Sequence, residues 1–129
     1  MKKKIFICGN PLVDVDSLPF RILPELRAIL PEIDFIDFDP TENFPHEDPL
    51  IIIDSVINAK EIMVIRDLLN LGDAPHVSAH DADLAFHLKW LEKMGQLPKL
   101  VIFGVPAEGE EKSILEDLVK MIKKGIVES

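Results

Sequence analysis

Short apolar runs of strand length alternate along this chain with longer stretches of helical periodicity, and this alternation most limits how it can fold. Most of the runs are followed by a turn or a loop and then by a segment with one apolar face. Alternating strands and helices favour right-handed crossovers and a mostly parallel sheet with helices on both faces. We therefore predict a three-layer α/β fold, flavodoxin-like in size. The expected strands are 4–8, 33–38, 50–54 and 100–105.

Three segments are expected to form helices that pack on this sheet. The first follows Ser17, which can act as its N-cap, and Pro24 should either kink it or delay its start. The other two helices are expected at 81–94 and 110–124. The segment 61–69 fits either a strand or a helix.

Length and composition set limits on the class of protein. The 129 residues suit a single α/β domain spanning 1–129, and 47% hydrophobic residues are enough for a core. A net charge of −9 argues against nucleic acid or an anionic membrane as partner. No segment approaches the about 20 apolar residues of a membrane span, and the basic start has too short an apolar run for a signal peptide. A single cysteine, Cys8, suits a reducing compartment, so we expect a cytoplasmic protein.

Acidic and imidazole side chains fall close to the ends of the predicted strands. Asp16 lies in the loop after the first strand, Asp54 ends the apolar run LIIID, and His80 lies just before the helix expected from residue 81. In an open parallel sheet, groups past the carboxyl ends of the strands converge on one crevice. Two carboxylates and one imidazole suit a divalent metal ion with open coordination positions. The sequence therefore predicts a metal site of Asp16, Asp54 and His80.

Each of these residues also has a simpler interpretation. Asp16 could cap the following helix, and an isolated histidine such as His80 is more often a surface or capping group. His76 and His87 compete with His80 for the same role. A carboxylate at the end of an apolar strand, such as Asp54, needs a partner or a wet crevice, so it favours function more than the others do.

Other chemistries lack their sequence motifs. The turn after the first strand, Gly9-Asn10-Pro11, is not part of a G-x-G-x-x-G fingerprint, and the chain has no P-loop lysine, so no nucleotide cofactor is expected. It also has no G-x-S-x-G nucleophile elbow. Chemistry that combines a metal with carboxylates is the kind that the residues favour.

The motifs around these residues resemble those of the hydrogenase maturation endopeptidases, which trim the C-terminal extension of the large subunit of nickel–iron hydrogenases. GNPLVDVD is similar to the family's G-N-x-L-x-x-D-[DE] loop and places Asp16 at its first metal position. LIIIDSV is similar to an apolar strand that ends in D-[AS] and places Asp54 at the second. SAHDADLAFHL is similar to an S-x-H segment that opens a helix and places His80 at the third. Asp39, in a stretch otherwise typical of a turn, resembles a family aspartate after the second strand.

This resemblance implies an endopeptidase that acts on the hydrogenase large-subunit precursor. Nickel already inserted in the precursor would be the recognition element, so the substrate would supply it, and Asp16, Asp54 and His80 would engage it. Asp39 would be a catalytic residue near the scissile bond. The chain departs from the family in lacking a D-G-x-G segment after the first motif and in having a short loop where a helix usually joins the second and third strands. The alternatives are a non-catalytic maturation factor that binds metal or precursor, and an ordinary metallohydrolase with its own zinc or manganese.

Overall fold

The structure, a computed structural model, describes residues 3–8, 18–38, 45–56, 59–66 and 79–128 of the chain; at 79–85 and 126–128 it describes the backbone alone. Five strands and four helices are found within these residues. In chain order they are β1 (Lys3–Cys8), α1 (Leu18–Arg21), α2 (Leu23–Ile29), β2 (Ile33–Phe38), β3 (Leu50–Val56), β4 (Met63–Ile65), α4 (Ala79–Lys93), β5 (Leu100–Pro106) and α5 (Glu111–Glu128).

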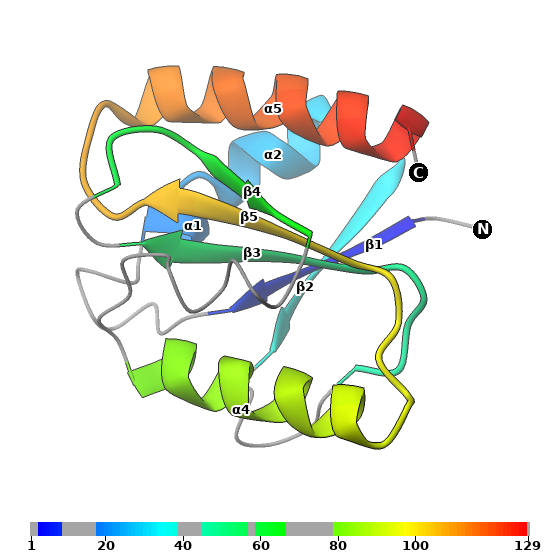
Figure 1. The fold of residues 1–129 in the computed structure, drawn as a ribbon. Coiled ribbons are helices and arrows are strands. Elements are labelled where there is room, and N and C mark those ends of the chain that lie inside the picture. Colours follow the sequence, from blue (N-terminus) through cyan, green and yellow to red (C-terminus); the bar gives the residue numbers. More distant parts are fainter. Residues whose placement is uncertain (1–2, 9–17, 39–44, 57–58, 67–78, 129) are drawn as a thin grey trace.

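The strands form one sheet in the order β2-β1-β3-β5-β4. The first four strands in this order are parallel, and β4 pairs antiparallel with β5 at the edge. Figure 1 shows α2 and α5 on one face of the sheet and α4 on the other. The fold is therefore the three-layer α/β fold with a mostly parallel sheet that the sequence predicts. The chain order reverses between β1 and β3, so a crevice is expected at their carboxyl ends.

The core follows from strands that are apolar on both faces. Every residue of β3 and β5 is buried, as expected for parallel strands that helices cover on both sides. Ile51 and Ile53 belong to the cluster shared with α1, α2 and α5, whereas Leu50 and Ile52 belong to the cluster that contains Leu88 of α4. Burying one such side chain contributes about 1.5–3 kcal/mol, so the central strands are the main source of stability.

The helices differ from the expected ones in two details. The first predicted helix is divided into α1 and α2, with Pro24 in the first turn of α2, in agreement with the expectation that proline delays the helix start. The last helix was expected to end at Lys124, but α5 continues through Gly125 to Glu128. Glycine usually ends a helix, yet Gly125 lies against β5, where an added Cβ would be 3.4 Å from Phe103 Cζ. The ambiguous segment 61–69 contains the short strand β4, and its last three residues lie outside the described ones.

None of the helices in the described part of the chain has the length and apolar character needed to cross a membrane.

Candidate functional site

Asp54 is a carboxylate in a strand that is otherwise almost wholly apolar. It is the fifth residue of the seven in β3, and only 5% of its surface is exposed. The backbone N–H of Ser55 donates a hydrogen bond to Asp54 Oδ1 over 2.9 Å. Among the described residues, Asp54 and Ser55 are the buried polar ones. Since a buried carboxylate is costly unless it is hydrogen-bonded, the Ser55 amide offsets part of that cost and helps to fix the orientation of the carboxylate.

The face of the sheet on which Asp54 lies follows from strand alternation. Residues two apart on a strand point to the same face, so Asp54 lies on the face of Leu50 and Ile52, which is the side covered by α4. In Figure 1, α4 begins at the same end of the sheet as that at which β3 and β5 end. His80 is the second residue of α4. The backbone therefore brings Asp54 and the helix turn that carries His80 to the same face and the same edge of the sheet.

The neighbour of Asp54 on β5 is a glycine that has no room for a side chain. Asp54 pairs in register with Gly104. A Cβ added at Gly104 would lie 2.8 Å from Val56 Cγ2 and 3.6 Å from Met63 Cβ, and the first of these distances is too short for two carbon atoms. The close approach of Gly104 to Val56 crosses from β5 to β3, so the sequence alone does not predict it.

The other predicted site residues are outside the part of the chain described. Asp16 precedes α1 by two residues, and Asp39 follows the last residue of β2, and neither is among the described residues. The same holds for the side chain of His80. Within the described residues, no three His, Cys, Asp or Glu side chains come together in a way that could hold a metal ion. The triad of Asp16, Asp54 and His80 therefore stays a prediction.

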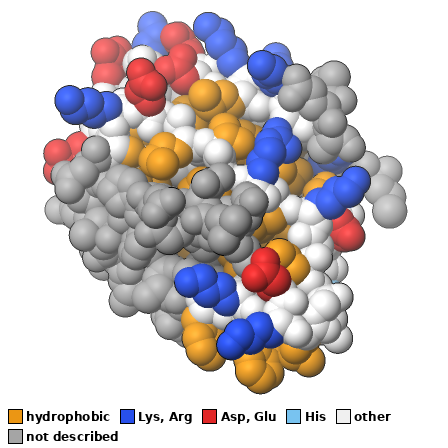
Figure 2. Space-filling model, viewed as in Figure 1, with side chains coloured by type: hydrophobic (Ala, Val, Ile, Leu, Met, Phe, Trp, Pro, Cys, Tyr) orange, Lys and Arg blue, Asp and Glu red, His pale blue; other side chains and the backbone are white. Residues whose placement is uncertain are grey.

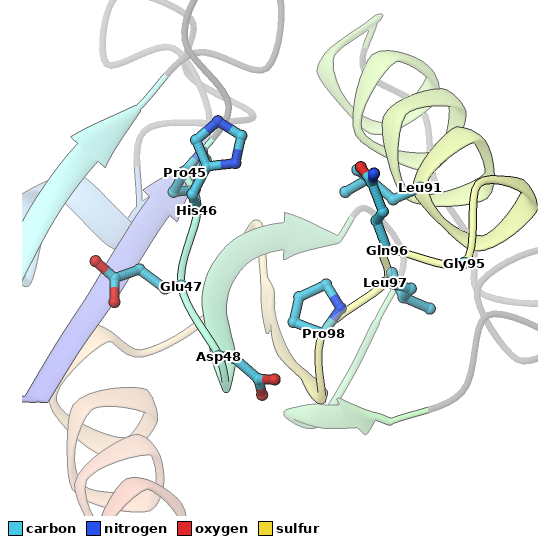
Figure 3. Close-up of a pocket in the computed structure, with 9 residues that line it drawn as sticks. All are labelled: Pro45, His46, Glu47, Asp48, Leu91, Gly95, Gln96, Leu97 and Pro98. Carbon is cyan, nitrogen blue, oxygen red and sulfur yellow. The ribbon is translucent and has the colours of Figure 1, made fainter.

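A separate cavity of about 430 Å³ lies at the opposite end of the sheet. Figure 3 shows the residues that line it. The segment 45–48, which leads into β3, forms one wall, and Leu91 with residues 95–98, which lead into β5, forms the other. Because both segments precede their strands, this cavity lies at the amino ends, away from Asp54. Asp48 in its wall accepts a hydrogen bond from the Lys99 backbone N–H over 3.2 Å, so this carboxylate ties the two segments together.

Comparison with known proteins finds matches in three-dimensional structure and none in sequence. No family model and no curated protein matches the chain. The fold is similar to that of a hydrogenase maturating endopeptidase. That protein, HybD from E. coli, aligns with a TM-score of 0.64 and 20% sequence identity, over 97% of this chain and 94% of its own. An uncharacterized protein from Wolinella succinogenes aligns with a TM-score of 0.60 and 14% identity, over 98% of this chain and 99% of its own. At these identities the likeness establishes the fold, and it covers nearly the whole of both chains.

Proposed function

We propose that this protein is an endopeptidase that removes the C-terminal extension from a nickel-loaded nickel–iron hydrogenase large-subunit precursor. The observation that carries the proposal is the buried carboxylate of Asp54, at the same edge and face of the sheet as the helix turn with His80. The fold in which it lies is similar over 97% of the chain to the hydrogenase maturating endopeptidase HybD. The sequence motifs around both residues support the same activity.

In the proposed reaction, Asp16, Asp54 and His80 engage the nickel ion that the precursor carries. Carboxylate oxygens and an imidazole nitrogen are ligands that a divalent ion can exchange, which suits a contact that must form and then release. The hydrogen bond from the Ser55 amide would keep the Asp54 carboxylate oriented toward the ion. Nickel held in this way can polarise the scissile carbonyl or activate water, and Asp39 is the candidate for a further catalytic role.

The test is a cleavage assay on a large-subunit precursor from the same genome, prepared with and without nickel. Intact mass or gel mobility reports the loss of the C-terminal extension. We expect the wild-type protein to shorten only the nickel-loaded form. Asp54→Asn and His80→Ala should lower the rate by about 10–100-fold, as loss of a group that supports a catalytic metal does.

Two control variants separate a site effect from a general loss of charge. Asp34→Asn removes an exposed carboxylate near the start of β2, and His46→Ala removes an exposed histidine at the amino edge of the sheet. Both should cleave like the wild type. Equal cleavage of loaded and nickel-free precursor would favour an ordinary metallohydrolase instead. Tight binding of the loaded precursor without cleavage would favour a non-catalytic maturation factor.

A further inference from the structure

The helix α4 carries large apolar side chains on its outer face as well as on its inner face. Leu88 is fully buried against the sheet. Phe86, Trp90 and Met94 are 67%, 55% and 50% exposed. These three residues are spaced by four, so they form one row along the side of the helix that faces away from the sheet. We call the surface made by Phe86, Lys89, Trp90, Lys93 and Met94 the α4 stripe.

The α4 stripe is unusual within this molecule. The described residues contain five exposed large hydrophobic side chains, and three of them belong to the stripe. By contrast, α5 has none among its described side chains, and it buries Ile114, Leu118 and Ile122 on one face. Contiguous exposed apolar surface of sufficient size marks an interaction site.

The charge of the α4 stripe also differs from that of the whole protein. Lys89 and Lys93 are exposed and follow Phe86 and Trp90 by three residues, which places them along the apolar row. Between residues 86 and 94 there are two lysines and one glutamate, a formal charge of 2 − 1 = +1, whereas the chain as a whole carries −9. Figure 2 shows hydrophobic side chains at the end of the molecule where α4 lies, with both Lys or Arg and Asp or Glu side chains near them.

These charges favour one kind of partner over others. A second copy of the chain docked through the same stripe would bring four lysines together, which opposes self-association. An anionic membrane would attract the two lysines, but it would repel a chain with nine excess negative charges. A protein surface with apolar side chains bordered by carboxylates complements both features of the stripe.

We propose that the α4 stripe is a docking surface for the folded protein substrate, the hydrogenase large-subunit precursor, through an apolar patch bordered by carboxylates. The inference rests on the proposed function, because it takes that precursor as the partner. The same helix begins with Ala79 and His80 at the edge where Asp54 lies. With a rise of about 1.5 Å per residue, the stripe lies about 9–21 Å along the helix from His80. A protein that covers about 800 Å² of this surface, as in a standard interface, would reach both regions at once.

Trp90 provides a probe of this contact, because it is the only tryptophan in the chain. The protein is labelled with fluorotryptophan and titrated with unlabelled nickel-loaded precursor, so that fluorine NMR reports Trp90 alone. The wild-type protein is used as the background, with a precursor in which a proline after the scissile bond blocks cleavage, so that Asp54 stays available to the nickel ion. We expect the Trp90 resonance to shift or broaden as the complex forms, and calorimetry on the same samples gives the dissociation constant.

Variants of the stripe test which residues make the contact. Phe86→Ser and Met94→Ser change exposed side chains and leave the Trp90 probe in place. We expect Phe86→Ser to weaken binding by at least about 30-fold, as loss of an interface anchor does. The double variant Lys89→Glu and Lys93→Glu should weaken binding by about 10-fold at low salt, with a smaller difference at high salt. Ile29→Ser is the matched control, because Ile29 is 46% exposed on α2, on the opposite face of the sheet. It should bind like the background protein.

The possible outcomes separate this inference from the proposed function. The docking surface is refuted, and the peptidase activity is supported, if the precursor is cleaved but its binding neither shifts the Trp90 resonance nor depends on Phe86. The docking surface is supported, and the peptidase activity is refuted, if binding shifts the Trp90 resonance and Phe86→Ser weakens binding but the wild-type protein does not cleave the precursor. Absence of any binding to the precursor refutes both. The inference is overturned if the protein forms a dimer that Phe86→Ser dissociates, because the stripe would then bind a second copy of the chain. It is also overturned if phosphatidylglycerol vesicles shift the Trp90 resonance and the precursor does not.

Discussion

Replacing Gly104 by alanine should destabilise the protein by overpacking the carboxyl end of β3. The added Cβ would lie 2.8 Å from Val56 Cγ2, whereas two carbon atoms in contact are normally about 3.5–4.0 Å apart. The neighbouring strands must therefore separate by about 1 Å or a side chain must leave its rotamer. Changes of this kind in a packed core typically cost about 1–3 kcal/mol.

The size of the effect can be converted into a melting temperature. An unfolding entropy of about 2.1 cal/mol/K per residue, taken over the 129 residues, makes 1 kcal/mol equivalent to about 4 °C. Gly104→Ala should then unfold about 4–12 °C below the wild type by calorimetry or by circular dichroism. Gly125→Ala is the matched control. Gly125 lies in α5, and its added Cβ would be 3.4 Å from Phe103 Cζ, which is an ordinary van der Waals distance. There alanine should be neutral or stabilising by up to about 1 kcal/mol.

A double-mutant cycle with Val56 decides whether the close contact is the cause. Val56→Ala alone removes buried methyl groups and should destabilise, but it also removes the Cγ2 atom that would meet the new Cβ. The double variant should therefore be more stable than the sum of the two single changes predicts. Strict additivity, or a Gly104→Ala variant that melts with the wild type, would refute the packing explanation.

Three further changes test the core, the site and the surface. Leu88→Ala removes the fully buried contact of α4 with the sheet and should lower the free energy of unfolding by about 2–5 kcal/mol, measured by urea denaturation. Asp54→Asn keeps an oxygen that can accept a hydrogen bond from the Ser55 N–H, so this variant should melt within about 4 °C of the wild type. Asp54→Leu removes that acceptor and should lower the free energy of unfolding by about 1–3 kcal/mol. Thermal denaturation of both variants measures the difference. Lys4→Ala removes an exposed ion pair in which Lys4 Nζ lies 3.1 Å from Glu47 Oε1. It should change the free energy of unfolding by no more than about 1 kcal/mol, measured by urea denaturation.

The sheet could be predicted from the sequence because its central strands are continuous apolar runs. LIIID and LVIFGV have no helical or alternating period, and between helical segments such runs indicate parallel strands covered on both faces. The strand β4 could not be assigned from EIMVIRDLL, since what makes residues 63–65 a strand is antiparallel pairing with β5 at the sheet edge. The predicted end of α5 was wrong: local propensity favours a stop at Gly125, but the helix continues to Glu128.

The candidate site could be predicted only in part. Asp54 was expected to end its strand, whereas β3 continues to Val56 and Asp54 is a buried residue two positions before that end. The packing role of Gly104 could not be predicted, because it depends on the distance to Val56 on another strand. The four-residue spacing of Phe86, Trp90 and Met94 is visible in the sequence, but their exposure depends on which face of α4 packs against the sheet.

The attachment of α4 to the sheet links the docking surface to the site. Between residues 86 and 93, Leu88 is the one buried side chain of α4, whereas α5 buries four large apolar ones: Ile114, Leu118, Val119 and Ile122. If each contributes about 1.5–3 kcal/mol, burial within residues 86–93 of α4 contributes less than burial within the longer described part of α5. A partner bound to the outer face of α4 would contact the helix whose second residue is His80, on the face of the sheet where Asp54 lies. In this arrangement, substrate docking and the geometry of the proposed site depend on the same helix.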